Sequence, residues 1–225
     1  MNNIIIAASK DWFNANNLPN NLNGINYKFF TKKSELNLKD IKKINPKYIF
    51  FPHWNWIVEE KIYNSFECIV FHTAPLPYGR GGSPIQNLIL KGIKMAPVCA
   101  LKMTEEIDGG PIYLKKNVSL SGNIEDIFNR ISKVIEGQIL KICMEEISPK
   151  PQLGKVKKFK RLTRKDNELS PSHSLNEIYD RIRMVDGLDY PRAFIDFGDY
   201  EVSFSKASLA KNQLSAQVNF KIKIK

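Results

Sequence analysis

Two residues of the chain, His72 and Asp108, have the types and the settings of an acid–base pair. His72 ends the apolar run ECIVFH before a Gly/Pro-rich turn, and Asp108 follows a further apolar run and precedes Gly109 and Gly110. In α/β proteins, side chains just beyond the carboxyl ends of strands face the ligand crevice. A carboxylate beside an imidazole orients the ring and favours its protonated form, which suits a base that works near neutral pH. A simpler role for Asp108 as a turn former stays open.

The three cysteines, Cys68, Cys99 and Cys143, favour a reducing compartment. They are odd in number, lie in apolar runs and show no CxxC spacing, so we interpret them as buried free thiols and expect no metal site. The longest apolar stretch near the N-terminus, Ile4 to Ala8, is far shorter than the roughly 20 residues of a membrane span. We therefore expect a soluble cytoplasmic protein with no export signal.

The charge balance points to an anionic partner. The chain of 225 residues has 34 basic and 23 acidic residues, a formal net charge of +11, and its composition of 43% hydrophobic residues excludes a disordered chain. Seven of the basic residues lie between Lys155 and Lys165, and without them the excess falls to +4. Because most of the excess is local, we expect a solvated basic linker rather than a nucleic-acid-binding surface.

The elements that must position these residues alternate along the first half of the chain. Short β-branched or aromatic runs predict strands over 3–8, 25–30, 47–51 and 67–72, and the intervening segments 11–18, 38–44 and 57–66 have helical length. A helix is expected over 85–91, strands over 97–103 and 112–116, and an amphipathic helix over 124–147. This alternation predicts an α/β fold, a Rossmann-like, mostly parallel sheet with helices on both faces.

The pattern changes after Pro149 and Pro151. A basic linker leads to a helix that begins with a capping box, Ser174 and Glu177, and strands are expected over 193–197, 200–205 and 215–224. We therefore predict a catalytic domain over residues 1–150, followed over 151–225 by a linker, a helix and a small β subdomain. Together the last two form a small α+β appendage.

The segment from FHTAPLPYGRGGSP to the loop EEIDGGP resembles the folate-dependent N-formyltransferases. That family has a strand that ends in Asn-x-His, a Leu-Leu-Pro turn, an Arg-Gly pair before a helix that begins with Pro, and an Asp-x-Gly loop. The matching residues, in order, are His72, Leu76, Pro77, Arg80, Gly81, Pro84, Asp108 and Gly110. The segment YDRIRMVDGLDYPRAFIDFG also looks like the start of the extra segment in sugar N-formyltransferases and methionyl-tRNA formyltransferases, so the likeness covers most of the chain.

The resemblance implies transfer of a formyl group from N10-formyltetrahydrofolate, the co-substrate, to a primary amine. By carry-over, His72 is the base and Asp108 orients it. The family's Asn, two residues before the histidine, is Val70 here, and a valine cannot donate a hydrogen bond to the developing oxyanion. We expect Asn55 to supply the donor, and Thr73, Ser83 and Gln86 are the alternatives. A non-catalytic folate- or nucleotide-binding relative also stays open.

The resemblance also implies where the ligands bind. The loop after the third strand would border the pterin together with the turn after His72 and the loop before Asp108; these residues are Trp56, Ile57, Val58, Leu76, Pro77, Met103, Thr104, Glu105, Glu106 and Ile107. The amine substrate would meet Thr73, Tyr78, Arg80, Gln86, Arg181 and Tyr190.

For the acceptor, we expect a nucleotide-linked amino sugar from the synthesis of surface glycans, lipopolysaccharide or nonulosonic acids. The roughly 75 residues after position 150 are too few for the β-barrel domain of methionyl-tRNA formyltransferases, so nucleic acid is not the expected partner. An aminoacyl-tRNA or another amine is the alternative acceptor. The resemblance to sugar N-formyltransferases also implies a homodimer through the C-terminal region.

Overall fold

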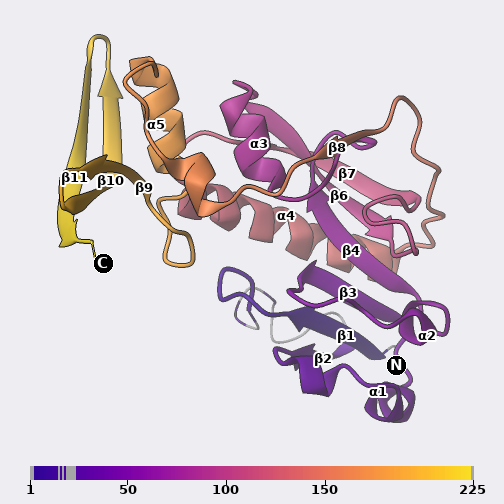
Figure 1. The fold of residues 1–225 in the computed structure, drawn as a ribbon. Coiled ribbons are helices and arrows are strands. Elements are labelled where there is room, and N and C mark those ends of the chain that lie inside the picture. The colour runs from indigo at the N-terminus through magenta and orange to yellow at the C-terminus, as the bar shows by residue number, and fades with distance from the viewer. Residues whose placement is uncertain (1–2, 15, 17, 19–23, 224–225) are drawn as a thin grey trace.

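A six-stranded sheet forms the centre of the molecule, in the order β2-β1-β3-β4-β6-β7. The computed structural model describes residues 3–14, 16, 18 and 24–223 (Figure 1). The first four strands are parallel, and β6 and β7 are added antiparallel, so the predicted Rossmann-like sheet is confirmed as a mixed, mostly parallel one. The strands are β1 (Asn3–Ala8), β2 (Asn26–Phe30), β3 (Tyr48–His53), β4 (Cys68–Thr73), β6 (Met95–Lys102) and β7 (Ile112–Ser119).

Helices cover both faces of this sheet, as expected. On one face α1 (Leu38–Ile44) and α2 (Glu60–Tyr63) contribute Ile41 and Ile62 to a core with Ile5, Ile49 and Phe51. On the other face α3 (Pro84–Leu90) and α4 (Ile124–Met144) pack against the opposite side chains of the same strands. Burial on both faces explains why the central strands are continuous apolar runs rather than alternating ones.

The amphipathic stripe of α4 is confirmed, and its ends have local causes. Asn123 and Asp126 form a capping box at the N-terminus, with hydrogen bonds of 3.0 and 2.9 Å in the two directions. The helix stops at Met144 rather than at 147 because Glu145 is already extended. The expected helix over 57–66 shrinks to α2, and the one over 11–18 lies partly outside the described residues, with Asp11 and Trp12 in a turn.

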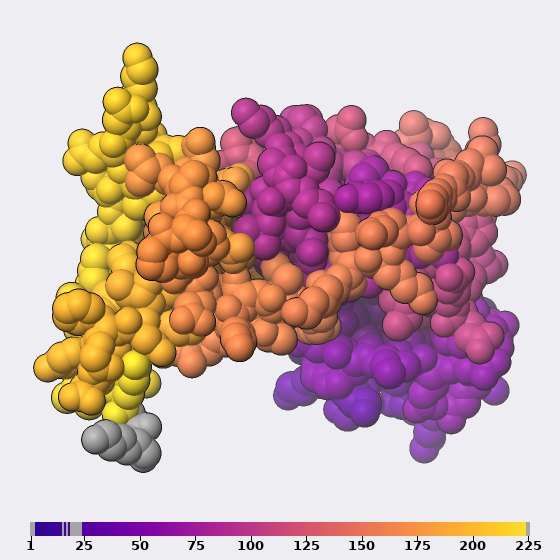
Figure 2. Space-filling view, turned by 45° about the horizontal axis from the view of Figure 1, so that its top comes forward, coloured from indigo at the N-terminus to yellow at the C-terminus, as the bar shows by residue number. Residues whose placement is uncertain are grey.

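The basic segment is not a solvated linker. We call residues 151–163 the crossing segment because they run across the surface past β5 and α3, in orange in Figure 2. Within the crossing segment, β8 (Lys157–Phe159) pairs in parallel with β5 (Tyr78–Gly81), and the Lys160 carbonyl accepts a hydrogen bond from the Asn87 side chain. The lysine side chains of β8 are exposed, but the Phe159 side chain is buried.

The C-terminal part shares its core with the sheet. It consists of the 3-10 helix η3 (Arg164–Asn167), the helix α5 (Leu175–Arg183) and an antiparallel sheet of β9 (Ala193–Phe197), β10 (Tyr200–Ala210) and β11 (Gln213–Ile222). In the N-terminal half, another 3-10 helix, η2 (Lys33–Glu35), precedes α1. Ile182, Met184 and Ala193 are fully buried in the cluster that includes α4. No helix among the described residues is long and apolar enough to cross a membrane.

We predict that Ile135→Ala lowers the free energy of unfolding by about 2–5 kcal/mol, because it empties part of the contact between α4 and the sheet. Ile135 is 1% exposed. Urea denaturation of both proteins measures the difference. Lys133→Ala, on the exposed face of the same helix, is the control and should change stability by no more than about 0.5 kcal/mol. A loss for Ile135→Ala as small as that of the control would contradict the packing described.

Candidate functional site

The structure brings His72 and Asp108 together, although 36 positions of the sequence separate them. His72 lies near the end of β4, and Asp108 lies in the turn that joins β6 to β7. The His72 Nδ1 and Asp108 Oδ2 atoms are 3.3 Å apart, and the two side chains are 8% and 12% exposed. Partial burial strengthens the attraction between an imidazolium and a carboxylate, because little water screens the two charges.

The other ring nitrogen of His72 faces a second acceptor. Its Nε2 atom lies 2.8 Å from the Gly79 carbonyl oxygen, which accepts a hydrogen bond when Nε2 carries the proton. The Asp108 carboxylate beside Nδ1 is an acceptor as well. A neutral ring therefore presents a proton to one of the two acceptors, and an imidazolium presents a proton to each.

Glycines allow the close approaches that this arrangement needs. Gly79 has a φ of +93°, and a Cβ atom there would lie 2.7 Å from the Phe159 ring. A Cβ atom on Gly110 would lie 1.8 Å from the Lys102 carbonyl oxygen, so the turn that carries Asp108 packs with its backbone directly on β6. Both positions exclude a side chain for steric reasons.

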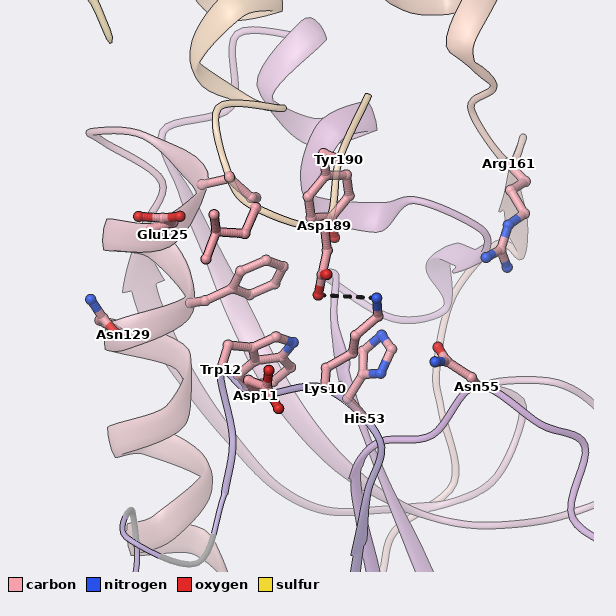
Figure 3. Close-up of a pocket in the computed structure, with 14 residues that line it drawn as sticks. Lys10, Asp11, Trp12, His53, Asn55, Glu125, Asn129, Arg161, Asp189 and Tyr190 are labelled. Atoms are coloured by element: carbon pink, nitrogen blue, oxygen red, sulfur yellow. Dashed lines mark ion pairs between the residues drawn. The ribbon is translucent and has the colours of Figure 1, made fainter. Parts of the chain in front are cut away.

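A cavity of about 500 Å³ opens at the carboxyl ends of β1 and β3 (Figure 3). The strand order 2-1-3 reverses at this pair of strands, and open α/β sheets bind ligands at such reversal points. Of the site residues expected from the sequence, only Asn55 and Tyr190 line this cavity. The lining residues are Lys10, Asp11, Trp12, His53, Asn55, Ile124, Glu125, Phe128, Asn129, Arg161, Gly187, Leu188, Asp189 and Tyr190.

Three stacked aromatic rings form one wall of the cavity. The Trp12 and Phe128 rings are nearly parallel at 4.8 Å, and the Phe128 and Tyr190 rings are 6.2 Å apart at 24°. Burial raises the pKa of the Tyr190 hydroxyl, although a side-chain hydrogen bond with Gln86 acts in the opposite direction. The position of Trp12 just after β1 was the available sequence signal for this wall, because ligands bind where strands end.

His53 is the buried titratable group of the cavity. Burial, together with the cations Lys10 and Arg161, lowers its pKa to about 4, so the ring is neutral near pH 7. Its Nδ1 atom is buried and has no hydrogen-bond partner among the described residues. Lys10 forms an ion pair of 3.0 Å with Asp189 across the cavity, as the dashed line in Figure 3 shows.

The crossing segment connects the cavity to the His72–Asp108 pair. Arg161, on the same side of the cavity as Asn55 in Figure 3, lies against Gly82, where an added Cβ atom would be 2.6 Å from the Arg161 Cβ. The neighbouring Gly81 donates its backbone N–H to Asp108 Oδ2 at 2.9 Å. The residue that Arg161 contacts, Gly82, thus directly follows the residue that bonds Asp108, Gly81.

The residues expected to border a pterin divide into two groups. Ile57 and Ile107 are 94% and 73% exposed, and Trp56 is 36% exposed with its ring 4.9 Å from that of Trp54. The other residues mostly stabilise the fold. Val58, Leu76 and Pro77 are buried, and the Met103 N–H donates to the Cys68 carbonyl. The Thr104 hydroxyl donates to the Glu106 carbonyl, and the Glu105 side chain is exposed.

Several residues expected to contact the amine substrate are buried or bonded to other groups of the protein instead. Arg80 is 6% exposed and forms an ion pair with Glu106 at 2.7 Å, so its charge is already balanced. Arg181 donates to the Asp166 carbonyl away from the cavity, and Gln86 is buried. The Thr73 side chain is buried as well, and the Tyr78 ring lies edge-on to Phe159.

Val70, at the position of the family's Asn, is a packing residue. It precedes His72 by two positions on β4 and thus points to the same face of the sheet. Its half-buried side chain contacts both hydrophobic cores. The Val70 side chain offers no hydrogen-bond donor.

The cysteines are free thiols, as the sequence predicts. Cys68 and Cys99 are buried and Cys143 is half-buried. Burial raises the pKa of Cys68 to about 12 and those of Cys99 and Cys143 to about 11, so all three are protonated near neutral pH. A protonated, buried thiol is a poor nucleophile.

Two family models match the chain. Residues 13–140 match the model described as "Formyl transferase", and residues 164–221 match "Methionyl-tRNA formyltransferase, C-terminal domain". The crossing segment lies between the two matches. The second match falls on η3, α5 and the antiparallel sheet.

Named proteins resemble the chain over most of its length. The methionyl-tRNA formyltransferase of Sulfurihydrogenibium sp. (strain YO3AOP1) is 30% identical over 195 residues, which are 82% of this chain but only 62% of that relative. The solved structure "Methionyl-tRNA formyltransferase from Clostridium thermocellum" is 42% identical, with a TM-score of 0.95, and the likeness covers 99% of this chain and 100% of that one. HypX from Aquifex aeolicus, solved with tetrahydrofolic acid, has a TM-score of 0.73 over 91% of this chain and 37% of its own; at 14% identity it shows the fold alone.

The expectation of a nucleotide-linked amino sugar as acceptor is wrong, and so are the glycan and lipopolysaccharide roles attached to it. The relatives at 30% and 42% identity are methionyl-tRNA formyltransferases, and the C-terminal match is to the same enzyme. The expectation that nucleic acid is not a partner is wrong as well. That expectation depends on the short length of the tail, and residues 164–221 of the tail nevertheless match the C-terminal domain of the same enzyme.

We predict that stability falls by about 1–3 kcal/mol as the pH drops from 6.5 to 4, and that His53→Asn removes this part of the loss. The pKa of His53 is about 4 in the folded protein and 6.5 in the unfolded one. Between these values the unfolded chain binds a proton that the folded chain does not, so acid favours unfolding. Denaturation of both proteins at a series of pH values measures this. Parallel pH profiles for the variant and the parent would contradict a neutral His53.

Proposed function

The chain belongs to the formyl transferase family, and we propose that it transfers a formyl group from N10-formyltetrahydrofolate to the primary amine of methionyl-tRNA. The observation that carries the chemistry is the His72 ring, held between a carbonyl and a carboxylate at the edge of the sheet beside the cavity. The family uses this folate as its formyl donor.

Exposed apolar side chains support a folate site. Ile107 directly precedes Asp108, and Trp56 lies on the loop after β3. Flat apolar walls with backbone groups nearby suit a pterin ring. We propose that Trp56, Ile57 and Ile107 contact the ring, while Val58, Leu76 and Met103 support these residues from the core.

The support for methionyl-tRNA comes from the relatives and from charge. Two methionyl-tRNA formyltransferases are 30% and 42% identical, although the chain spans 62% of the length of the first of them. In the structure, Lys157, Lys158 and Lys160 are exposed on the crossing segment, whose Arg161 lines the cavity. A row of exposed cations that leads into a cavity suits the phosphate backbone of an RNA acceptor end.

We assign the proton transfer to His72. When bound, the folate supplies the formyl carbon that the amine attacks; the amine gains the formyl group, and N10 takes a proton in its place. The His72 ring accepts the proton that the amine loses and then returns a proton to N10 as it departs. The imidazolium that exists between these steps is paired with the Asp108 carboxylate, whose Oδ2 lies 3.3 Å from Nδ1.

A hydrogen-bond donor must also stabilise the charge that develops on the formyl oxygen. We propose the Asn55 side-chain amide, since Val70 cannot serve. Asn55 is exposed at the cavity, and its backbone N–H is anchored on Ser9 Oγ at 3.0 Å. A donor on an anchored loop needs little reorganisation when the charge appears.

Formylation of methionyl-tRNA by the purified protein, followed by mass analysis of the aminoacyl ester, tests the proposed function. We expect His72→Asn and Asp108→Asn each to lower kcat by about 10²–10⁴-fold, the range for loss of acid–base catalysis. The control is His173→Asn, whose ring accepts a backbone N–H in the C-terminal part. Normal turnover in both site variants would refute the assignment, and no formylation by the parent protein would favour a non-catalytic folate-binding relative.

Asn55→Ala should lower kcat by about 10²–10³-fold with little change in KM, because an oxyanion donor acts on the developing charge. Steady-state kinetics with methionyl-tRNA measures both constants. Asn64→Ala, which removes an exposed side-chain amide on the other side of α2, is the matched control. If Asn55→Ala kept the parent kcat, the donor would have to be sought at Thr73, Ser83 or Gln86.

A further inference from the structure

The turn that carries Asp108 is only partly held by its own backbone. The Gly109 N–H donates to the Glu106 carbonyl at 3.0 Å, whereas Asp108 has a φ of +53°, in the left-handed region that few residues with a side chain adopt, and two glycines follow it. Its carboxylate has one backbone partner, the Gly81 N–H. A turn of this kind keeps its carboxylate at a set distance from His72 only if other groups hold its backbone.

Gln152, in the crossing segment, forms hydrogen bonds that fix the backbone of this turn. Its Nε2 atom lies 2.7 Å from the Asp108 carbonyl oxygen and 2.9 Å from the Gly110 carbonyl oxygen. Both hydrogens of the side-chain amide are therefore used, one on each side of Gly109. The contact joins residues 44 and 42 positions apart in the sequence.

Arg80 determines which way the Gln152 amide points. Its Nε and Nη2 atoms donate to Gln152 Oε1 at 3.1 and 2.9 Å, and its Nη1 atom pairs with Glu106 at 2.7 Å. A guanidinium only donates, so it must face the amide oxygen, and the amide NH₂ group must then face the two carbonyls. Arg80 is 6% exposed, so this arrangement excludes most water.

We propose that Gln152, oriented by Arg80, is a positioning residue that sets Asp108 against His72. This inference rests on the proposed function, which gives the His72–Asp108 distance its catalytic meaning. Only a side-chain amide of this length accepts from Arg80 and donates twice to the turn. A glutamate has the same shape and still accepts from Arg80, but it has no N–H for the carbonyls. Gln152→Glu thus removes the hold with little change in volume.

Steady-state kinetics of Gln152→Glu tests the proposal. We expect kcat to fall by about 10–100-fold while KM for the folate and for the acceptor changes by less than about twofold, because the pair is displaced and the binding surfaces are not. In an Asp108→Asn background, measured under single turnover, the same substitution should have almost no further effect, because Gln152 acts through Asp108. An equal loss in both backgrounds would overturn the proposal.

Gln138→Glu is the matched control. Gln138 is a buried glutamine on α4 that donates to one backbone carbonyl, that of Val98, away from Asp108. The substitution Gln138→Glu should change the stability of the protein but not the kcat of the folded fraction. An equal fall in kcat for Gln138→Glu would show that the effect of Gln152→Glu is merely structural.

A readout without catalysis separates this proposal from the proposed function. The Gly81 amide proton donates to the Asp108 carboxylate, and a charge-assisted bond of this kind moves its NMR signal downfield. In Gln152→Glu that signal should move upfield and exchange faster with solvent, whether or not the protein formylates an acceptor. An unchanged Gly81 signal would overturn the positioning role even if the parent enzyme is active.

Discussion

The structure depends on one constraint, namely that two acceptors face the two nitrogens of a single buried imidazole. The Gly79 carbonyl and the Asp108 carboxylate lie 2.8 and 3.3 Å from the His72 ring. A neutral ring satisfies only one of them, whereas an imidazolium satisfies both. A ring between two acceptors can present a proton to each of them once it has taken the proton of an attacking amine.

The framework around the ring follows from that constraint. β4 brings His72 to the edge of the sheet, and β5 presents the Gly79 carbonyl where a larger residue would collide with Phe159. The crossing segment then performs three tasks within a dozen residues. It holds the Asp108 turn through Gln152, pairs with β5 through β8, and extends Arg161 into the cavity. A segment with five basic residues is thereby a structural part of the site.

The error about the acceptor has a physical origin. The length of the tail does not identify a domain type, because a domain is defined by its strand pairing and buried contacts rather than by how many residues it has. Here α5 and β9 bury Ile182, Met184 and Ala193 in the main core, and this part matches the C-terminal domain model of methionyl-tRNA formyltransferase. The division at residue 150 consequently separates segments that share one core.

Much of the fold follows from the sequence alone, because periodicity and capping are relations between near neighbours. The isoleucine runs of the strands, the stripe of α4 and the capping boxes at Asn123 and Ser174 all belong to this group. The places of His72 and Asp108 beyond two strands predict that both lie at one edge of the sheet, and the family resemblance predicts that they act as a pair. The cavity wall of Trp12, Phe128 and Tyr190, the neutral His53 and the contact of Gln152 with Asp108 join segments far apart in the chain. Only the tertiary structure decides such contacts, because the distance and burial that create them depend on the path of the whole chain.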